Sequence, residues 1–347
     1  MKRQLKILNI IDIPWYSGLS DYAFAQSDIL EKAGHIIYFA CPKNSLSEKL
    51  AKEKGYKTIN IQDRKKILNP FIIIKLINFI RKEGIDILNA HTGKTQSIAY
   101  IISFFCHNIK IIRTKADTKK ATKSFTYSRI NLIICGSKYI KDMFSNINNK
   151  KSVVIYKSII LPEYKPIVKE KPFKIGILGR LDPVKGHIYF IKAAVDILSK
   201  GYNCNFFISG KEANIKWNEL LELIPDNFKY AFTYSGYVDD VYKFISDCHI
   251  GVISSISSEA VSRVAIEWMS SGRLVISSNV GCLGEFVSDE YIVPRMDSYA
   301  LSKKIIEKLD FNIIEKAGLE NLQRIKNNFS YEKFYKETLS VFEELVY

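Results

Sequence analysis

Two cationic side chains stand on a glycine-bounded segment that follows an apolar run. Residues 179–186 read GRLDPVKG, which places Arg180 and Lys185 between a predicted strand at 173–178 and a predicted helix at 186–198. At the carboxyl end of a parallel strand such cations can bind a diphosphate, Arg through its planar fork and Lys as a point charge. Two cations of this kind, taken alone, are more often solvated loop residues. They are therefore candidates for phosphate binding that need a second feature in support.

A second segment carries two glutamates eight positions apart. Glu259 and Glu267 flank the start of an amphipathic helix predicted at 263–271, which follows a buried strand. A helix that begins near Ser262 attracts an anion to its amino end, and ionised carboxylates accept hydrogen bonds from sugar or ribose hydroxyls. The alternative is a surface ion pair between Glu267 and Arg263, which stand four positions apart on the same helix.

Two further candidates follow predicted strands in the first half of the chain. Gly18 lies in the loop after the first strand, where a glycine permits a close approach to the backbone. His91 ends the predicted strand at 85–90, and it could hydrogen-bond a reacting group or be a satisfied core histidine. The GKT sequence at 93–95 imitates the end of a phosphate-binding loop, but that loop needs a glycine where Leu88 stands. We therefore reject a P-loop at this position.

Short apolar runs alternate with helical patterns along the whole chain, as in parallel sheets covered on both faces. The runs that we predict as strands are 5–11, 36–40, 85–90, 109–113, 132–135 and 153–156, then 173–178, 205–209, 230–234, 250–253 and 274–277. Between the two series, residues 161–172 contain three prolines, which is typical of a linker. The prediction is an α/β fold of two doubly wound Rossmann-like domains, 1–165 and 166–329, with a cleft between them.

The composition is that of a folded globular protein, with 47% hydrophobic residues in a chain of 347. Six isolated cysteines without C-x-x-C spacing argue against a disulfide framework or a zinc cluster, and they fit a reducing compartment. No apolar segment reaches the length of about 18 residues that a membrane span requires. The net charge of +15 is uneven: residues 1–170 carry 30 Lys and Arg against 13 Asp and Glu, whereas residues 171–347 carry 21 against 23. The first half should therefore meet an anionic surface, which could be nucleic acid, a membrane or an acidic substrate.

The two candidate segments of the second half occur together in an order and spacing that resemble one enzyme family. GRLDPVKG, followed further along by SEAVSRVAIEWMSSGRLVISSNVGCLGE, resembles the retaining glycosyltransferases of family 4, of the bacterial cell-surface polysaccharide and lipopolysaccharide type. Members of that family have the GT-B fold. The resemblance implies that the first domain binds the acceptor and the second a nucleotide-sugar donor. It also implies a C-terminal helix near 330–347 that packs back on the first domain.

The same resemblance implies roles for individual residues. In the family an Arg and a Lys bind the donor diphosphate, two glutamates contact the donor sugar and ribose, a loop glycine closes on the donor phosphate, and a histidine lies near the reacting sugar. The implied donor-binding residues are Gly18, Arg180, Lys185, Val238, Glu259, Ser262, Arg263 and Glu267, and the implied catalytic residues are His91, Arg180, Lys185 and Glu259. Ser262 and Arg263 stand where the family usually has a glycine-rich or Phe-Gly stretch, so side-chain donors would replace backbone contacts there.

The implied reaction moves a sugar from a nucleotide diphosphate to a hydroxyl group with retention at the anomeric carbon. It implies front-face attack, in which the donor phosphate takes the acceptor proton and the enzyme supplies no nucleophile. Since the chain contains no D-x-D tripeptide, we expect neither a metal nor another cofactor. The donor nucleotide, UDP, GDP or ADP, stays open because this fold recognises the base largely through its backbone.

The basic first half is then the acceptor half. We expect residues 98–123, which combine aliphatic, Phe and basic side chains, to rest on the anionic inner face of the cytoplasmic membrane. The acceptor would be a lipid-linked saccharide in lipopolysaccharide or surface polysaccharide synthesis, and the protein would be cytoplasmic and peripheral to the membrane. One alternative is a nucleic-acid-binding protein, for which no recognised binding motif is present. The other is a sugar-nucleotide epimerase or a phosphorylase with the same fold.

Overall fold

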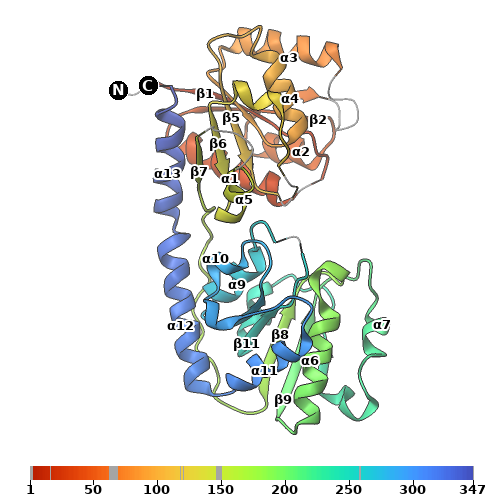
Figure 1. Ribbon diagram of the computed structural model, residues 1–347. Coiled ribbons are helices and arrows are strands. Elements are labelled where there is room, and N and C mark those ends of the chain that lie inside the picture. Colours follow the sequence, from red (N-terminus) through yellow and green to blue (C-terminus); the bar gives the residue numbers. More distant parts are fainter. Residues whose placement is uncertain are drawn as a thin grey trace. The chain divides into compact units, whose positions relative to one another are not determined.

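The chain divides into two compact units, each built around one parallel sheet (Figure 1). The structure, a computed structural model, describes residues 3–15, 17–61, 69–117, 119, 121–145, 151–257 and 259–346. Unit 1 comprises residues 1–158 together with 331–347, and unit 2 comprises residues 159–330. The sequence places the boundaries at 165 and 329. The predicted fold class, two Rossmann-like α/β domains, is confirmed.

Unit 1 contains a seven-stranded parallel sheet in the order β3-β2-β1-β4-β5-β6-β7. Its strands are β1 (Lys6–Ile10), β2 (Ile36–Pro42), β3 (Lys57–Ile61), β4 (Ile87–Ala90), β5 (Lys110–Lys115), β6 (Leu132–Cys135) and β7 (Ser152–Val154). β4 and β6 are buried along their whole length, as central strands covered on both faces should be. The edge strand β3 was not among the predicted strands, and it buries only Ile59 and Ile61.

Helices pack on this sheet and complete unit 1. They are α1 (Gly18–Lys32), α2 (Leu46–Glu53), α3 (Pro70–Glu83), α4 (Gly93–Ile102), α5 (Lys138–Asp142) and α13 (Tyr331–Glu343), with a 3-10 turn η1 (Phe125–Arg129). A capping box between Thr92 and Thr95 starts α4, and Gly84, with φ of 65°, ends α3. α13 packs against α1 (Figure 1), where the rings of Tyr22 and Phe334 meet edge to face at 6.1 Å. The last helix therefore belongs to the core of unit 1.

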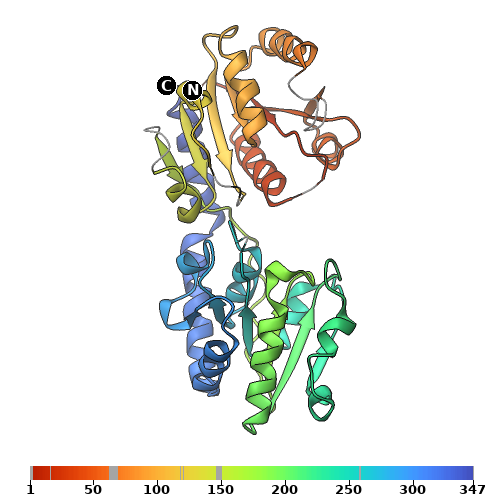
Figure 2. The same cartoon turned by 45° about the vertical axis from the view of Figure 1, so that its right-hand side comes forward.

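Unit 2 contains a six-stranded parallel sheet in the order β10-β9-β8-β11-β12-β13. Its strands are β8 (Phe173–Leu178), β9 (Cys204–Ser209), β10 (Phe232–Tyr234), β11 (Ile250–Ile253), β12 (Leu274–Ser278) and β13 (Ile292–Val293). Its helices are α6 (His187–Ser199), α7 (Trp217–Leu221), α8 (Val241–Ser246), α9 (Arg263–Ser270), α10 (Leu283–Phe286), α11 (Ser298–Glu307) and α12 (Phe311–Asn328), with 3-10 turns η2 (Pro183–Lys185), η3 (Asp226–Ala231) and η4 (Asp289–Tyr291). α6, in green, lies alongside β9 (Figure 2). Among the helices of the described ranges, none is both long enough and apolar enough to cross a bilayer.

A buried tryptophan fixes α9 on the two central strands of unit 2. The side chain of Trp268 has no exposed surface, and it lies over Gly176 of β8 and Gly251 of β11. A Cβ added to Gly251 would lie 2.3 Å from Cδ2 of Trp268, and one added to Gly176 would lie 2.8 Å from its Cη2. Both strands therefore need glycine for the helix to approach this closely. The contact sets the position of the start of α9, which carries three of the predicted site residues.

Candidate functional site

The strand order of unit 2 reverses between β8 and β11. β9 follows β8 on one side of it, whereas β11 lies on the other side. In open parallel sheets, ligands bind beyond the carboxyl ends of the strands at such a switch point. The loops that leave these two strands are residues 179–186 and 254–262. They contain the two cations and the first glutamate that the sequence predicts for the donor site.

Lys185 and Glu259 meet across these two loops. Nζ of Lys185 lies 2.6 Å from Oε1 of Glu259, and the side chains are 24% and 6% exposed. The hydroxyl of Ser255 donates a second hydrogen bond to the same carboxylate oxygen, at 2.7 Å. The pair lines a small pocket at the ends of β8 and β11, together with apolar residues that include Ile177 and Val252. The structure thus brings together two predicted site residues that stand 74 positions apart.

Close backbone contacts fix the two loops. Gly186 has a φ of 70°, and a Cβ on it would lie 1.9 Å from the carbonyl oxygen of Ser254. Gly281 has a φ of 58°, and a Cβ there would lie 1.9 Å from the carbonyl oxygen of Glu259. That carbonyl accepts a hydrogen bond from the N–H of Cys282 at 2.8 Å. Because both glycines need a positive φ and a close approach, the backbone itself sets the position of the Lys–Glu pair.

Arg180 lies on the first of these loops and makes a different contact. Its Nε lies 3.3 Å from Oδ2 of Asp182, and most of its side chain is exposed. Asp182 is buried and accepts hydrogen bonds from the N–H of Val184 at 3.1 Å and from the side-chain amide of Asn214 at 3.0 Å. Arg180 is therefore anchored by Asp182 and exposes its guanidinium to a ligand.

Three predicted residues lie at the start of α9. Ser262 is buried, and its N–H donates to Sγ of Cys282 at 3.2 Å. Its hydroxyl has no hydrogen-bond partner among the described residues. Nε of Arg263 lies 2.7 Å from Oε1 of Glu267, so the ion pair that the sequence offers as an alternative is present. The structure brings Glu267 together with Arg263 and leaves the buried Ser262 hydroxyl without a partner among the described residues.

Val238 lies half-buried in the loop after β10. That loop passes through Gly236, whose φ is 63° and whose carbonyl accepts hydrogen bonds from the N–H of Gly210 at 2.8 Å and from the hydroxyl of Ser209 at 3.0 Å. These bonds fix the loop at the ends of β9 and β10. Since all strands of the sheet are parallel, Val238 lies at the same sheet edge as the Lys–Glu pair.

In unit 1, His91 follows β4 and is completely buried. Its Nε2 lies 2.9 Å from Oδ1 of Asn9, whereas its Nδ1 has no hydrogen-bond partner within the described part of the chain. Burial, with a smaller contribution from the Arg113 cation, lowers the pKa of His91 to about 3. The ring is therefore neutral at physiological pH. Its burial matches the alternative of a core histidine.

Gly18 is the first residue of α1. A Cβ added to it would meet no atom beyond its chain neighbours within 4 Å. Packing inside the protein therefore does not require a glycine here. The preceding residue, Ser17, is the N-cap of α1, but its side chain makes no capping hydrogen bond. At the amino end of α1, the space beside Gly18 is therefore unfilled, and the Ser17 hydroxyl has no hydrogen-bond partner among the described residues.

Sequence reasoning missed a buried polar cluster at the carboxyl ends of β1, β4 and β5. Asp12 is fully buried, and neither of its carboxylate oxygens has a hydrogen-bond partner among the described residues. Arg113 donates through Nη1 to the carbonyl of Ala90 at 3.1 Å. Burial lowers the pKa of Lys115, an effect opposed by Asp117, whose Oδ1 lies 2.7 Å from its Nζ. Charged residues directly after apolar runs are the signal that could have located this cluster. In the described ranges, no three His, Cys, Asp or Glu side chains are grouped so as to hold a metal ion.

The burial of β5 limits which residues of the segment 98–123 could rest on a membrane. Arg113 and Lys115 are buried because β5 is an inner strand of the sheet. They cannot contact a bilayer. The exposed apolar side chains of this segment lie just after α4, at Phe104 and Phe105. Only the turns of this segment therefore offer exposed apolar surface that a membrane could contact.

The two parallel α/β units and the site at the switch point of the second define a GT-B fold. Residues 172–310 match the family model described as glycosyl transferases group 1. The matched stretch lies in unit 2, and it includes Arg180, Lys185, Glu259 and Glu267.

Known proteins are similar to the chain over most of its length. An uncharacterized glycosyltransferase of Methanocaldococcus jannaschii is 28% identical over 320 residues, which cover 84% of this chain and 87% of the relative. The capsular polysaccharide biosynthesis glycosyltransferase CapM of Staphylococcus aureus is 26% identical over 308 residues, covering 78% and 80%. The crystal structure of Anabaena Alr3699/HepE in complex with UDP has a TM-score of 0.79, with 14% identity, and covers 99% of this chain and 100% of that one.

Proposed function

We propose that this chain is a retaining glycosyltransferase that moves a sugar from a nucleotide diphosphate to a hydroxyl group. The observation that carries the proposal is the Lys185–Glu259 pair at the switch point of unit 2, inside the group 1 domain. A diphosphate offers Lys185 an anion, and sugar or ribose hydroxyls offer hydrogen-bond donors to Glu259. The UDP bound to HepE supports the same class of donor.

The leaving diphosphate gains negative charge as its bond to the sugar breaks. Lys185, Arg180 and the amino end of α9 are preorganised positive groups at one edge of the sheet, and Ser262 adds a hydroxyl donor. When a donor binds, Lys185 exchanges part of its contact with Glu259 for a phosphate oxygen. The carboxylate then accepts hydrogen bonds from the sugar. The pair thereby links recognition of the diphosphate to recognition of the sugar.

Retention follows, in this proposal, from attack on the face that the diphosphate leaves. A donor phosphate oxygen takes the proton of the acceptor hydroxyl, so no side chain forms a covalent intermediate. Neutral His91 positions a reacting sugar through its Nδ1. We also propose that the reaction needs no metal, because Arg180 and Lys185 supply the positive charge that the diphosphate requires.

The proposed acceptor is a lipid-linked saccharide in the synthesis of lipopolysaccharide or another surface polysaccharide. The positive charge of residues 1–170 supports an anionic environment for unit 1. The similarity to CapM, which is named for capsular polysaccharide biosynthesis, supports this class of acceptor. We place the protein in the cytoplasm, on the inner face of the cytoplasmic membrane.

The surface that we propose for membrane contact is the aromatic face, defined as Phe104, Phe105 and Phe125 with Arg81 and Arg129. The three phenylalanines are exposed. The guanidinium of Arg129 lies 4.7 Å from the ring centroid of Phe104, and Arg81 donates to the carbonyl of Phe105 at 2.8 Å. Exposed rings beside guanidinium groups suit the headgroup region of an anionic bilayer.

The donor site is tested by removing the charge of Lys185. Saturation-transfer NMR with UDP-, GDP- and ADP-sugars first identifies the donor, and NMR of the product gives its anomeric configuration. Lys185→Ala should then lower transfer by about 100-fold or more, as expected when a preorganised contact to the leaving group is lost. Lys192→Ala removes an equal charge from an exposed position of α6 and should leave transfer unchanged.

Three outcomes would contradict parts of this proposal. Unaltered transfer by the folded Lys185→Ala protein would exclude the donor site as described. Binding of no sugar nucleotide would exclude the proposed function. Loss of activity in EDTA that Mn²⁺ restores would overturn metal independence alone.

A further inference from the structure

Six buried polar side chains form a hydrogen-bonded network between α1 and three strands of the unit 1 sheet. Each of them is at most 1% exposed. They are Asn9 of β1, Gln26 and Ser27 of α1, Asn89 of β4, Thr114 of β5, and His91 just after β4. The proposed function uses only His91 among them. Because side chains buried so deeply largely satisfy one another, the donor and the acceptor of each hydrogen bond can be assigned from the neighbouring bonds.

The serine of this network fixes the orientation of the Asn9 amide group. The hydroxyl of Ser27 donates to the carbonyl oxygen of Ala23 at 2.8 Å. A hydroxyl group has one proton, so Oγ of Ser27 can only accept from Asn9, whose Nδ2 lies 3.1 Å away. The amide nitrogen of Asn9 therefore faces α1, and its Oδ1 faces β4.

Asn89 approaches the same oxygen of Asn9 with its amide nitrogen. Nδ2 of Asn89 donates to Oδ1 of Asn9 at 3.0 Å. Oδ1 of Asn89 accepts from the hydroxyl of Thr114 at 2.8 Å, and that hydroxyl lies farther, at 3.4 Å, from Oε1 of Gln26. The single proton of the Thr114 hydroxyl is therefore donated to Asn89. The bonds on both sides of Asn9 thus agree that its Oδ1 is an acceptor.

His91 joins the network through Nε2, which lies 2.9 Å from Oδ1 of Asn9. An amide oxygen has no proton to donate, so this contact is a hydrogen bond only if Nε2 carries the proton. The His91 ring is neutral at physiological pH, because burial lowers its pKa to about 3. A neutral imidazole has a single N–H group. Nδ1 of His91 therefore carries a lone pair and no proton.

We propose that Asn9 is a positioning residue, which holds the proton of the His91 ring on Nε2 and leaves Nδ1 as a hydrogen-bond acceptor. A group that contacts Nδ1 must then be a donor, as a sugar hydroxyl is and an unprotonated phosphate oxygen is not. His91 consequently cannot act as a general acid through Nδ1. Only the role of His91 towards a sugar rests on the proposed function, because the tautomer is a property of the chain by itself.

Reversing every hydrogen bond of the network would give the other tautomer. The amide groups of Asn9 and Asn89 would both turn over, and the hydroxyl of Ser27 would donate to Asn9. This arrangement loses the 2.8 Å bond from Ser27 to the carbonyl of Ala23. It also leaves the hydroxyl of Thr114 only the 3.4 Å contact with Gln26 as a donor. The distances therefore favour the arrangement with the proton on Nε2.

The tautomer is measured by nitrogen-15 NMR on the full chain with labelled histidine, in the absence of any sugar nucleotide. The chemical shift of a ring nitrogen depends on whether that atom carries a proton, and His91→Asn assigns the two signals of His91. At neutral pH, Nε2 should be protonated and Nδ1 should not.

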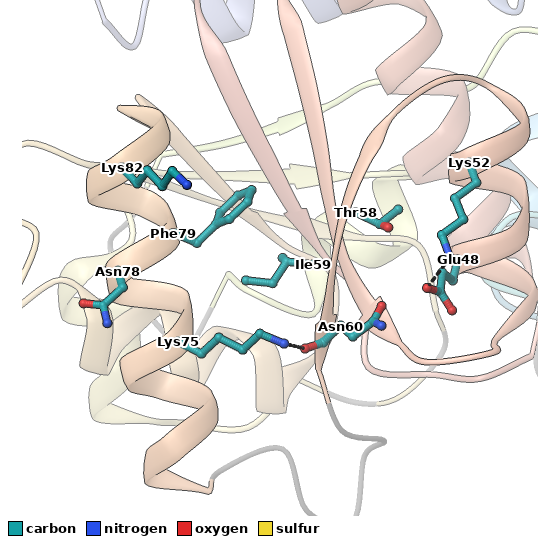
Figure 3. A pocket seen from close by; sticks show the side chains of 9 residues that line it. All are labelled: Glu48, Lys52, Thr58, Ile59, Asn60, Lys75, Asn78, Phe79 and Lys82. Carbon is teal, nitrogen blue, oxygen red and sulfur yellow. Dashed lines mark hydrogen bonds and ion pairs between the residues drawn. The ribbon is translucent and has the colours of Figure 1, made fainter.

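Asn9→Leu tests the role of the amide group, because it keeps the branching of the side chain and removes the acceptor. The Nε2 proton of His91 then loses its partner, and the ratio of the two tautomers should shift by about tenfold towards a proton on Nδ1. The control Asn60→Leu makes the same replacement on β3, beside a cavity at the sheet edge that opens to solvent (Figure 3), and should leave both His91 signals unchanged.

Ser27→Ala is the second variant, which keeps the test decisive if Asn9→Leu does not fold. It removes the group that orients the Asn9 amide, so the ratio should shift in the same direction. Its control is Ser47→Ala, which removes a buried hydroxyl of α2 that has no hydrogen-bond partner among the described residues, and which should not change the ratio.

Two results would overturn the inference. The first is a proton on Nδ1 of His91 in the wild-type protein, alone or together with one on Nε2. The second is a tautomer ratio that neither Asn9→Leu nor Ser27→Ala changes from its wild-type value. Failure of the proposed transfer reaction would appear elsewhere, as absent binding of sugar nucleotides, and would leave the measured tautomer as it is.

Discussion

The contact between Lys185 and Glu259 should couple two loops of unit 2, and a double-mutant cycle measures that coupling. The variants are Lys185→Met, Glu259→Gln and their combination. Glu259 is only 6% exposed, with Ser255 as its second hydrogen-bond donor. Removing the ammonium leaves a nearly buried carboxylate poorly solvated, which should cost about 2 kcal/mol of the free energy of unfolding. Removing the carboxylate should cost about 1 kcal/mol, because Lys185, 24% exposed, regains contact with water.

The double variant should lose only about 1 kcal/mol, since neither charge is then left without its partner. The coupling free energy is therefore expected at about 2 kcal/mol. Unit 2 offers a matched control in Lys229 and Asp226, whose charged atoms lie at the same 2.6 Å separation but whose side chains are exposed. Solvent weakens such a pair, so its cycle should show no coupling beyond experimental error.

Tryptophan fluorescence can follow the unfolding of unit 2 separately. Trp217 and Trp268 lie in unit 2, whereas Trp15 lies in unit 1 and is exposed. In a Trp15→Phe background, urea unfolding therefore reports on unit 2, and the four members of each cycle can be compared. A coupling for Lys185 and Glu259 no larger than that of the exposed control would refute the argument that burial strengthens this pair.

Three other features of the structure lead to single measurements. Gly281→Ala places a Cβ 1.9 Å from the carbonyl oxygen of Glu259 and should destabilise unit 2 by about 2 kcal/mol or more in thermal melting. Gly201→Ala, with positive φ but open space, should cost about 1 kcal/mol, and equal losses would contradict the contact. His91 has a folded pKa of about 3 against an ordinary 6.5, so between these values the unfolded chain binds a proton that the folded chain does not. The free energy of unfolding should then fall by about 1.4 kcal/mol per pH unit as the pH drops through this window. His91→Asn should remove this contribution, measured by urea unfolding followed by circular dichroism at several pH values. An unchanged pH dependence in the variant would rule out His91 as its cause. Phe125→Ser should weaken co-sedimentation with anionic vesicles several-fold, whereas wild-type binding as strong to neutral vesicles would count against the aromatic face.

The donor side of the site could be predicted because chain order and sheet topology determine it. Apolar runs identify β8 and β11, and a parallel sheet brings the carboxyl ends of both strands to one edge. Lys185 and Glu259 therefore had to lie near each other. The direct Lys185–Glu259 contact was beyond prediction, because it depends on loop backbone such as the positive φ of Gly281. The Arg263–Glu267 contact was predicted as an alternative, because the two residues are four positions apart on one helix.

Two features of unit 1 could not be predicted from the periodicity of hydrophobic residues. β3 is short and half-exposed, so its pattern did not distinguish it from a loop, and the cavity beside it depends on how α3 lies. Arg113 and Lys115 were expected at the surface because charged residues are rarely buried without partners. Their partners, the carbonyl of Ala90 and the carboxylate of Asp117, become apparent only once the backbone is in place.

Because the chain returns to unit 1 after unit 2, the two units are not completed in the order in which their translation begins. Unit 2 is one continuous stretch of sequence, whereas unit 1 also needs α13, whose Phe334 packs on Tyr22. Domains fold as units while the ribosome extends the chain from its amino end. Unit 2 therefore has its complete sequence before unit 1 does. Until α13 emerges, the nascent first domain keeps the apolar surface around Tyr22 uncovered. A helix that is translated after unit 2 therefore completes the domain that was started before it.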